Sequence, residues 1–262
     1  MKTAAGQWDD LIVRLASGGA VAVIGLTAVW FGGIAFIVLT VVISAAMVWE
    51  LVRMLDREAP ALMLAGVAGL ALAVAELLPP GYALPILIAP CFVGFGQLSQ
   101  HRATFTVFTL MILLAGYGLF ALRDEFGFIW MLWLALVVIA TDVFGYFAGR
   151  FIGGPKFWPR VSPKKTWAGT VAGWVAAAGV GVIFIGLTPV KAQIVGISIA
   201  VSMASQIGDI AESSVKRRMG VKDSSSLIPG HGGLFDRFDG MLGAAVFLLL
   251  VEQLVDFPPG LP

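Results

Sequence analysis

Charged residues are scarce in this sequence, and their scarcity excludes a soluble globular domain. Asp, Glu, Lys and Arg make up 13% of the chain, against about 25% in soluble domains. Hydrophobic residues make up 59%, and the mean hydropathy is +0.93. A soluble chain could not bury so much apolar surface, so the composition predicts an all-α, polytopic integral membrane protein. The net charge of +1 argues neither for nor against an anionic partner, and we expect no nucleic-acid partner.

Cysteine and histidine are also rare. Cys91 is the single cysteine, so no intrachain disulfide can form. With one distant cysteine and two histidines in the whole chain, a zinc site is disfavoured. The first ten residues lack the short apolar core of a signal peptide, and we expect none to be removed. We also find no internal repeat, although transporters commonly show one.

Long apolar runs dominate what is present. A helix needs about 20 residues to cross a hydrocarbon core, and on that basis we predict about nine transmembrane helices after a short interfacial helix at 8–16. We divide the chain into an N-terminal interfacial segment (1–18), N-terminal transmembrane helices (19–126) and a C-terminal transmembrane region (127–262) with long polar loops at 150–168 and 217–237. The predicted spans are 19–31, 34–54, 61–78, 82–98, 103–122, 128–150, 169–187, 192–216 and 238–255.

The distribution of basic residues orients these spans. With the N-terminus in the cytoplasm, 15 of the 17 Lys and Arg residues fall on the cytoplasmic side, and only Arg123 and Lys191 fall outside. Positive residues accumulate in cytoplasmic loops of membrane proteins. The sequence therefore predicts a cytoplasmic N-terminus and places both long polar loops in the cytoplasm.

Polar residues recur on one face of the predicted span 192–216. A carboxylate inside a span costs about 2.5–3.5 kcal/mol on insertion scales, so it needs protein or water beside it. For the serines and Gln206 we favour a polar contact between helices. For Asp209, followed one turn later by Glu212, we favour a functional site. The face comprises Ser202, Ser205, Gln206, Asp209, Glu212, Ser213 and Lys216.

Two further segments are weaker candidates. Asp142, Tyr146 and Arg150 are spaced four residues apart, which puts them on one helix face; a site and a structural pair remain equally open there. In the loop 150–168, Ser-Pro at 162–163 is expected to open a turn. Lys164 and Lys165 provide a positive field for phosphate, and a basic loop that only sets the topology is the alternative interpretation.

The stretch 213–239 is a dense polar island between apolar segments. Gly230, Gly232 and Gly233 surround His231 and allow a ligand close to the backbone. His231 is a candidate base, a hydrogen-bond donor or a plain loop residue. Asp236 and Asp239 share a helix face, and hard oxygen ligands beside basic residues suit Mg²⁺ holding nucleotide phosphates. The basic residues are Lys216, Arg217, Arg218, Lys222 and Arg237.

This stretch resembles the signature of the phosphatidate cytidylyltransferase (CDP-diacylglycerol synthase) family. Segments 206–209, 142–150 and 162–166 are also similar to that family, although Ala168 stands where it usually has Glu. The N-terminal half matches only in its apolar layout and in Glu50 after Trp49. The signature positions are Ser213, Val215, Lys216, Arg217, Lys222, Asp223, Ser225, Ile228, Pro229, His231, Gly232, Gly233, Asp236, Arg237 and Asp239.

The resemblance implies a reaction in which CTP and phosphatidic acid give CDP-diacylglycerol and pyrophosphate. It also implies Mg²⁺ with a possible K⁺, a bacterial inner membrane, a cytoplasmic active site and a homodimer. Asp209 and Asp236 match the family's metal-site aspartates, and Asp239 is a further candidate ligand. We assign catalysis to Asp209, Asp236, Lys216, Arg217, Lys222, Arg237 and His231, and substrate binding to Asp142, Ser162, Lys164, Lys165, Thr166, Asp223, Gly232 and Gly233.

Two other functions remain open from the sequence. A CTP-dependent lipid kinase would transfer the γ-phosphoryl group to a lipid alcohol, and it would need a base for a neutral hydroxyl. An ion-coupled transporter would use Asp142, Asp209 and Glu212 as an ion path. The clustering of polar residues near one membrane face and the missing repeat favour the enzyme.

Overall fold

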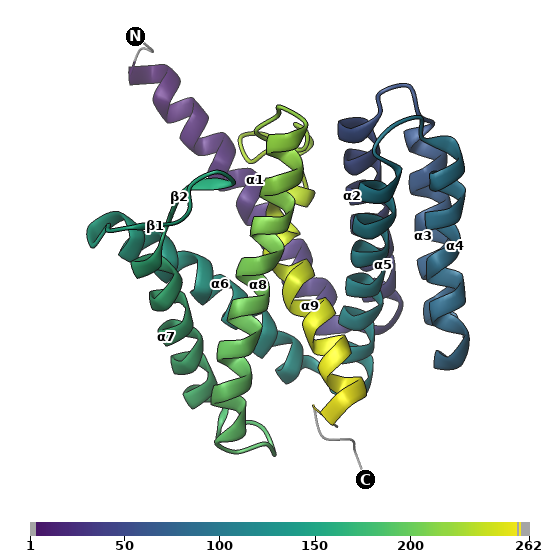
Figure 1. Ribbon diagram of the computed structural model, residues 1–262. Helices are drawn as coiled ribbons and strands as arrows, with labels where there is room; N and C mark the ends of the chain where they lie inside the picture. Colours follow the sequence, from purple (N-terminus) through teal and green to yellow (C-terminus); the bar gives the residue numbers. More distant parts are fainter. Residues whose placement is uncertain (1–3, 256, 258–262) are drawn as a thin grey trace. The chain divides into compact units, whose positions relative to one another are not determined.

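The computed structural model describes the backbone of residues 4–255 and residue 257, and the side chains of residues 16–252, 254 and 257. Within these residues the chain is nearly all-α (Figure 1), as predicted. The helices are α1 (Ala4–Phe31), α2 (Gly33–Leu55), α3 (Ala61–Leu77), the 3₁₀ turn η1 (Pro80–Tyr82), α4 (Ala83–Gln97), α5 (Arg102–Glu125), α6 (Phe128–Phe151), α7 (Trp167–Phe184), α8 (Gln193–Arg218) and α9 (Phe235–Val255).

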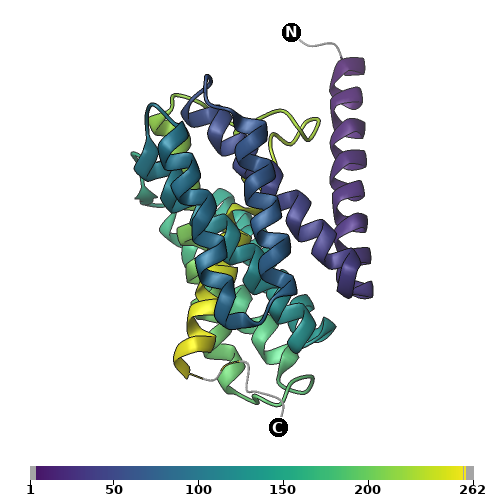
Figure 2. The same cartoon turned by 90° about the vertical axis from the view of Figure 1, so that its right-hand side faces the viewer.

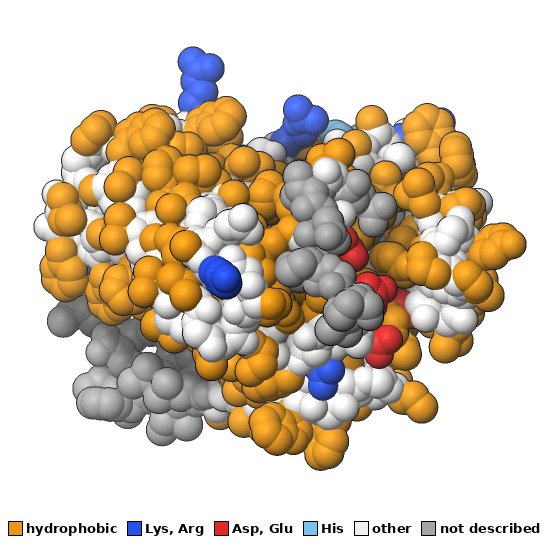
Figure 3. Space-filling model, turned by 90° about the horizontal axis from the view of Figure 1, so that it is seen from below, with side chains coloured by type: hydrophobic (Ala, Val, Ile, Leu, Met, Phe, Trp, Pro, Cys, Tyr) orange, Lys and Arg blue, Asp and Glu red, His pale blue; other side chains and the backbone are white. Residues whose placement is uncertain are grey.

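Several of these helices are long and apolar enough to cross a membrane. By length and composition six qualify within the described residues, and α3 and Ala16–Phe31 are apolar but shorter. Figure 3 shows a face of the molecule on which hydrophobic side chains predominate and charged ones are few. The six are α2, Pro80–Gln97, α5, α6, α7 and α8. The count of nine spans stays a prediction.

The predicted helices from α2 to α9 begin and end within three residues of the structure's bounds. The N-terminus differs, because α1 is one continuous helix where we predicted an interfacial helix and a separate span. Gly18 and Gly19 do not interrupt it, since glycine also adopts the helical conformation at a modest cost. The helix ends at Phe31, and Gly32, with a φ of 64°, makes the sharp turn into α2 (Figure 2).

The loop 150–168 is the second difference. It contains a small antiparallel hairpin of β1 (Lys156–Trp158) and β2 (Ser162–Thr166) rather than irregular backbone. The expected Ser-Pro turn is wrong: Ser162 pairs with Trp158, and the turn precedes it at residues 159–161. Proline tolerates the edge of a two-stranded ribbon because its missing N–H then costs no ladder bond.

The chain forms two compact units that are discontinuous in sequence. Unit 1 comprises Met1–Leu113 and Met219–Phe238, and unit 2 comprises Leu114–Arg218 and Asp239–Pro262. The loop 219–234 therefore belongs with the N-terminal helices, whereas our division at 1–18, 19–126 and 127–262 followed the chain in order.

In unit 1, α2, α3 and α4 lie side by side (Figures 1 and 2). Gly69 of α3 allows α3 to pack closely against α2, because a Cβ at Gly69 would lie 3.2 Å from Ala45 Cβ of α2. At one end, Asp56 accepts hydrogen bonds from the Ser99 hydroxyl (2.6 Å) and amide (2.9 Å). These bonds, chiefly that of the hydroxyl, lower the pKa of Asp56 to about 2. Their contribution to stability is therefore present above the ordinary pKa of 3.8 and is lost as the pH falls from there through about 2.

In unit 2, polar side chains join α6, α7 and α8. Trp133 donates to Ser198 (2.9 Å) and Thr141 donates to Ser202 (2.8 Å). Gln206 accepts from Trp174 (2.9 Å) and donates to the Thr170 carbonyl. Ser202 and Gln206 thus form the interhelical polar contacts that we predicted, and Ser198, which we did not single out, forms another. The predicted Ser205 has no hydrogen-bond partner among the described residues, and Ser213 bonds Asp209 of its own helix.

Glycines set how closely α7 and α8 approach, and this gives a stability prediction. A Cβ on Gly181 would lie 2.8 Å from Val195 Cα, a backbone atom that cannot rotate away. Gly181→Ala is expected to destabilise unit 2 by about 1–3 kcal/mol through overpacking, lowering the unfolding temperature by roughly 2–10 °C. The measurement is a thermal melt in detergent. Gly179→Ala is the control, since a Cβ at Gly179 meets nothing within 4 Å; equal melting of the two variants would contradict the prediction.

Candidate active site

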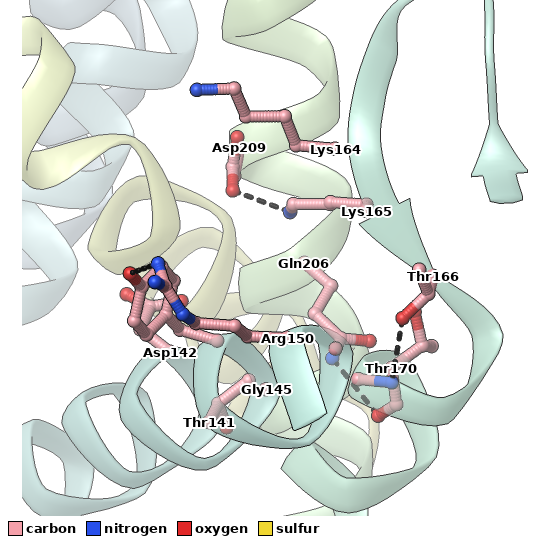
Figure 4. Close-up of a pocket in the computed structure, with 13 residues that line it drawn as sticks. Thr141, Asp142, Gly145, Arg150, Lys164, Lys165, Thr166, Thr170, Gln206 and Asp209 are labelled. Atoms are coloured by element: carbon pink, nitrogen blue, oxygen red, sulfur yellow. Dashed lines mark hydrogen bonds and ion pairs between the residues drawn. The ribbon is translucent and has the colours of Figure 1, made fainter. Parts of the chain in front are cut away.

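A pocket of about 540 Å³ opens in unit 2 between α6, β2, α7 and α8 (Figure 4). Close contacts between glycines bring its walls together: a Cβ on Gly145 of α6 would lie 3.2 Å from the Gly169 carbonyl of α7. Thr166 caps α7 by accepting from the Gly169 amide (3.2 Å), which fixes the end of β2 at the pocket. The lining residues are Thr141, Asp142, Gly145, Tyr146, Gly149, Arg150, Lys164, Lys165, Thr166, Gly169, Thr170, Gln206 and Asp209.

Asp209 and Lys165 form an ion pair in this pocket, although they are far apart in the sequence (Figure 4). Asp209 comes from α8 and Lys165 from β2, and each side chain is 26% exposed. Ser213 donates to the other Asp209 oxygen (3.2 Å). On α6, Arg150 donates to the Tyr146 hydroxyl (3.1 Å), so these two residues share a face as predicted. The pocket thus combines an acidic group with basic groups suited to phosphate.

Three aspartates from three helices lie near this site. Asp142 of α6 and Asp239 of α9 each interact electrostatically with Asp209 of α8, and Asp239 also interacts with Asp142. Lys165 and Lys216 partly offset this negative charge. Like charges held together without a cation repel one another, so the arrangement favours binding of a positive ion.

The donor set fits Mg²⁺ by its chemistry. In the described residues no three His, Cys, Asp or Glu side chains are close enough to form a complete metal site. Mg²⁺ does not require one, because it keeps several waters and is usually held by one or two carboxylates together with substrate phosphates. Carboxylate oxygens from Asp209, Asp142 and Asp239 are ligands of that kind.

The loop 219–234 of unit 1 surrounds a second pocket of about 440 Å³. The tip of this loop is a turn in which the His231 amide donates to the Ile228 carbonyl (2.9 Å), with Pro229 and Gly230 between them. Gly230 has a φ of 75°, which the third residue of a type II turn requires. The lining residues are Lys222, Asp223, Ser225, Ser226, Ile228, Pro229, Gly230, His231, Gly232 and Arg237.

His231 is held on two sides in unit 1. Arg237 donates to its carbonyl (2.9 Å), and its Nδ1 lies 2.9 Å from the Ser17 hydroxyl of α1. That hydroxyl donates its proton to the Pro229 carbonyl (2.9 Å). Ser17 thus ties both the side chain of His231 and the turn at Pro229 to α1. No pattern in the sequence singles out Ser17 for this contact.

Comparison with known proteins decides the family. The profile of the cytidylyltransferase family matches residues 12–255. The chain belongs to the cytidylyltransferase family. The family assignment and the apolar helices together identify an integral membrane protein. Membership of this family also weighs against an ion-coupled transporter.

Three bacterial relatives illustrate the extent of the similarity. A phosphatidate cytidylyltransferase of Brucella abortus is 35% identical over 266 residues, covering 95% of this chain and 96% of the relative. One from Bacillus subtilis is 29% identical over 267 residues, covering 94% and 98%. One from Mycobacterium tuberculosis is 36% identical over 162 residues, covering 60% of this chain and 49% of the relative.

The two pockets account for most of the site residues predicted for this cytidylyltransferase family member. Asp142, Lys164, Lys165, Thr166 and Asp209 line the first pocket. Of the predicted residues in unit 1, five line the second pocket: Lys222, Asp223, His231, Gly232 and Arg237.

The remaining predicted residues take other places. Ser162 lies in the hairpin, Arg217 is exposed on α8, and Lys216 is nearly buried in an ion pair with Glu212 (2.6 Å). In unit 1, Asp236 and Gly233 hold the loop together, because Asp236 Oδ2 accepts from the Gly233 amide (2.8 Å). Metal ligation by Asp236 stays a prediction, as do the roles of these other residues.

Proposed function

We propose that this protein transfers CMP from CTP to phosphatidic acid, giving CDP-diacylglycerol and pyrophosphate. The observation that carries the proposal is the pocket of unit 2, where Asp209, Lys164 and Lys165 meet beside helices apolar enough to lie in a membrane. The pocket belongs to a chain of the cytidylyltransferase family whose relatives carry the name of this activity. The test is the identity of the lipid product and the nucleotide by-product that purified protein makes from CTP and phosphatidic acid.

The residues suit the bonds that must form and break. A phosphate oxygen of phosphatidic acid attacks the α-phosphorus of CTP, and the bond from that phosphorus to the bridging oxygen breaks to release pyrophosphate. The nucleophile is already anionic at neutral pH, so the reaction needs no strong general base. The main obstacle is repulsion between two anions, which Lys164, Lys165 and Arg150 can offset by binding phosphate oxygens.

We propose Mg²⁺ as the cofactor, held by Asp209 with Asp142 or Asp239 of the same unit. Asp236, which belongs to unit 1, is a candidate ligand from the family resemblance alone. When bound, it would neutralise the phosphates and stabilise the charge that develops on the leaving oxygen. K⁺ is a second proposed ion at this site. The support for K⁺ is that Asp209 and Asp236 match the metal-site aspartates of the family that the sequence resembles.

Metal removal gives a direct prediction. Excess EDTA is expected to abolish turnover, and added Mg²⁺ is expected to restore it, because the proposed ligands are hard carboxylates without a zinc-type donor set. The measurement is the rate of CDP-diacylglycerol formation before and after each addition. Full turnover in EDTA would exclude the metal from the reaction.

The site is proposed to face the cytoplasm of a bacterial inner membrane. The support is the excess of basic residues on the side that carries loops 150–168 and 217–237, together with the bacterial relatives. The same orientation and a count of nine spans place the C-terminus outside. A reporter fused after Pro262 is therefore expected to report a non-cytoplasmic location, and a cytoplasmic signal would contradict the odd span count.

The family resemblance also supports a homodimer as the proposed assembly.

The lipid kinase is the alternative reaction at the same pocket, and its products would be CDP and a lipid phosphate. Among the described residues that line this pocket, the carboxylates are Asp142 and Asp209, and Asp209 is paired with Lys165. Pairing makes Asp209 a poor base for a neutral hydroxyl, so a kinase at this pocket would have to use Asp142 as its base.

A further inference from the structure

Glu50 is a buried carboxylate of unit 1 that lies outside both pockets. It sits near the end of α2, and its side chain is fully inaccessible. Its Oε1 accepts from the Ser225 hydroxyl (2.6 Å) and the Leu234 amide (3.0 Å). Its Oε2 accepts from the Phe235 amide (2.7 Å) and the Ser224 hydroxyl (3.2 Å). All four donors come from the loop 219–234 and the first residue of α9.

These four bonds explain how a carboxylate can be buried there. An ionised carboxylate has about four acceptor positions, and here each oxygen receives one backbone N–H and one hydroxyl. The two amides lie at the N-terminus of α9, where backbone N–H groups lack partners within the helix and the helix dipole favours a negative charge. Glu50 therefore caps α9 from a different helix.

The same bonds close the loop on itself. Ser224 and Ser225 lie before the His231 turn, and Leu234 and Phe235 lie after it, so one side chain joins the two ends. Asp236 adds a second clasp, since its Oδ2 accepts from the Ser224 amide (2.9 Å) and the Gly233 amide (2.8 Å). The single proton of the Ser224 hydroxyl is shared between Asp236 (3.0 Å) and Glu50 (3.2 Å). A Cβ on Gly233 would overlap Ser224 and Glu50, so the junction has no room for another side chain.

We infer that Glu50 is a positioning residue: from α2 it fixes the loop that presents Lys222 and His231 at the second pocket, together with the start of α9, which carries Arg237. Their use by substrate phosphate rests on the proposed function, whereas the fixing of the loop does not. Glu50 itself lines neither pocket, so it acts through the residues it holds. The sequence could not reveal this, because Glu50 and Ser224 are 174 residues apart.

Glu50→Gln tests the inference with little change in size. The amide replaces one acceptor oxygen by an NH₂ group, and because each oxygen receives one backbone N–H, the NH₂ must face either Leu234 or Phe235. We expect hydrogen exchange of peptides covering 222–235 to accelerate at least about tenfold, which corresponds to about 1.4 kcal/mol of local opening. Exchange in α3 and α4 is expected to stay unchanged.

The matched control is Glu58→Gln, the same change at an exposed glutamate of unit 1; its loop exchange is expected to match that of the wild type. Glu50→Asp keeps the charge and is expected to recover part of the protection. It also provides a readout if the Gln variant does not fold. Ser225→Ala, which removes one of the four bonds, is expected to shift exchange in the same direction by less.

Activity provides the second readout. For Glu50→Gln we expect kcat/KM to fall by about tenfold or more, with partial rescue by Glu50→Asp and none of this loss in Glu58→Gln. Unchanged loop exchange in Glu50→Gln would overturn the inference, and so would an equal acceleration throughout α2–α4, which would mark a merely structural residue. Exchange is measured without substrate, so it can support the inference even if CDP-diacylglycerol is not the product.

Discussion

Asp209→Asn is expected to lower the rate of CDP-diacylglycerol formation by at least about a thousandfold, or about 4 kcal/mol of barrier. The substitution keeps the size of the side chain and much of its hydrogen bonding, including an acceptor for Ser213. It removes the negative charge that a cation needs, and it breaks the ion pair with Lys165. If Asp209 only joined helices, Asn would serve nearly as well, since hydrogen bonds between membrane helices average about 0.6 kcal/mol.

The comparison is made at equal amounts of folded, membrane-inserted protein. Asp124→Asn is the matched control, because Asp124 is an exposed aspartate of the same unit at the end of α5. The control is expected to keep wild-type activity. A rate for Asp209→Asn within about threefold of wild type, or roughly 0.65 kcal/mol, would remove Asp209 from the metal assignment and leave it to Asp236 and Asp239.

Lys165→Ala is expected to lower kcat/KM by about a hundredfold, or about 2.7 kcal/mol. Lys165 lines the pocket and holds Asp209, so its loss removes a phosphate partner and leaves a partly buried carboxylate without its cation. Lys165→Arg keeps the charge but has a different shape, so it is expected to recover only part of the activity. Steady-state kinetics with CTP as the varied substrate provide the measurement.

The hairpin supplies a matched control for that experiment. Lys156→Ala removes the same group from β1, where the side chain is exposed and outside both pockets. It is expected to stay within about threefold of wild type, because exposed charges interact weakly with their surroundings. Equal losses in the Lys156 and Lys165 variants would mean that general positive charge, rather than a defined pocket residue, accounts for the effect.

Helix positions were predictable because apolar length is a strong signal in a membrane protein. Helices α2–α9 were anticipated closely for that reason. The hairpin was missed because three- and five-residue strands carry little pattern. The continuity of α1 was missed because the interfacial segment 8–16 and the apolar run 19–31 were treated as separate helices, whereas one helix carries both.

The site was predictable only in part. The periodic face of span 192–216 identified Asp209, because an acidic residue within an apolar helix needs a reason. The pairing of Asp209 with Lys165 depends on how α8 meets β2, which no local pattern encodes. Glu50 carried almost no signal, since one glutamate near the end of an apolar helix is ordinary. Its role appears only when the loop 219–234 is seen around it.

The most direct test of the proposed reaction asks which phosphate of CTP, the α- or the γ-phosphate, enters the lipid product. Purified protein is incubated with Mg²⁺, phosphatidic acid and CTP labelled at either the α- or the γ-phosphate, and diacylglycerol is offered in a parallel reaction. The account predicts that the α-label enters the lipid product from phosphatidic acid while the γ-label leaves as pyrophosphate. Transfer of the γ-label to diacylglycerol, with no α-label in any lipid, would contradict it and identify a lipid kinase.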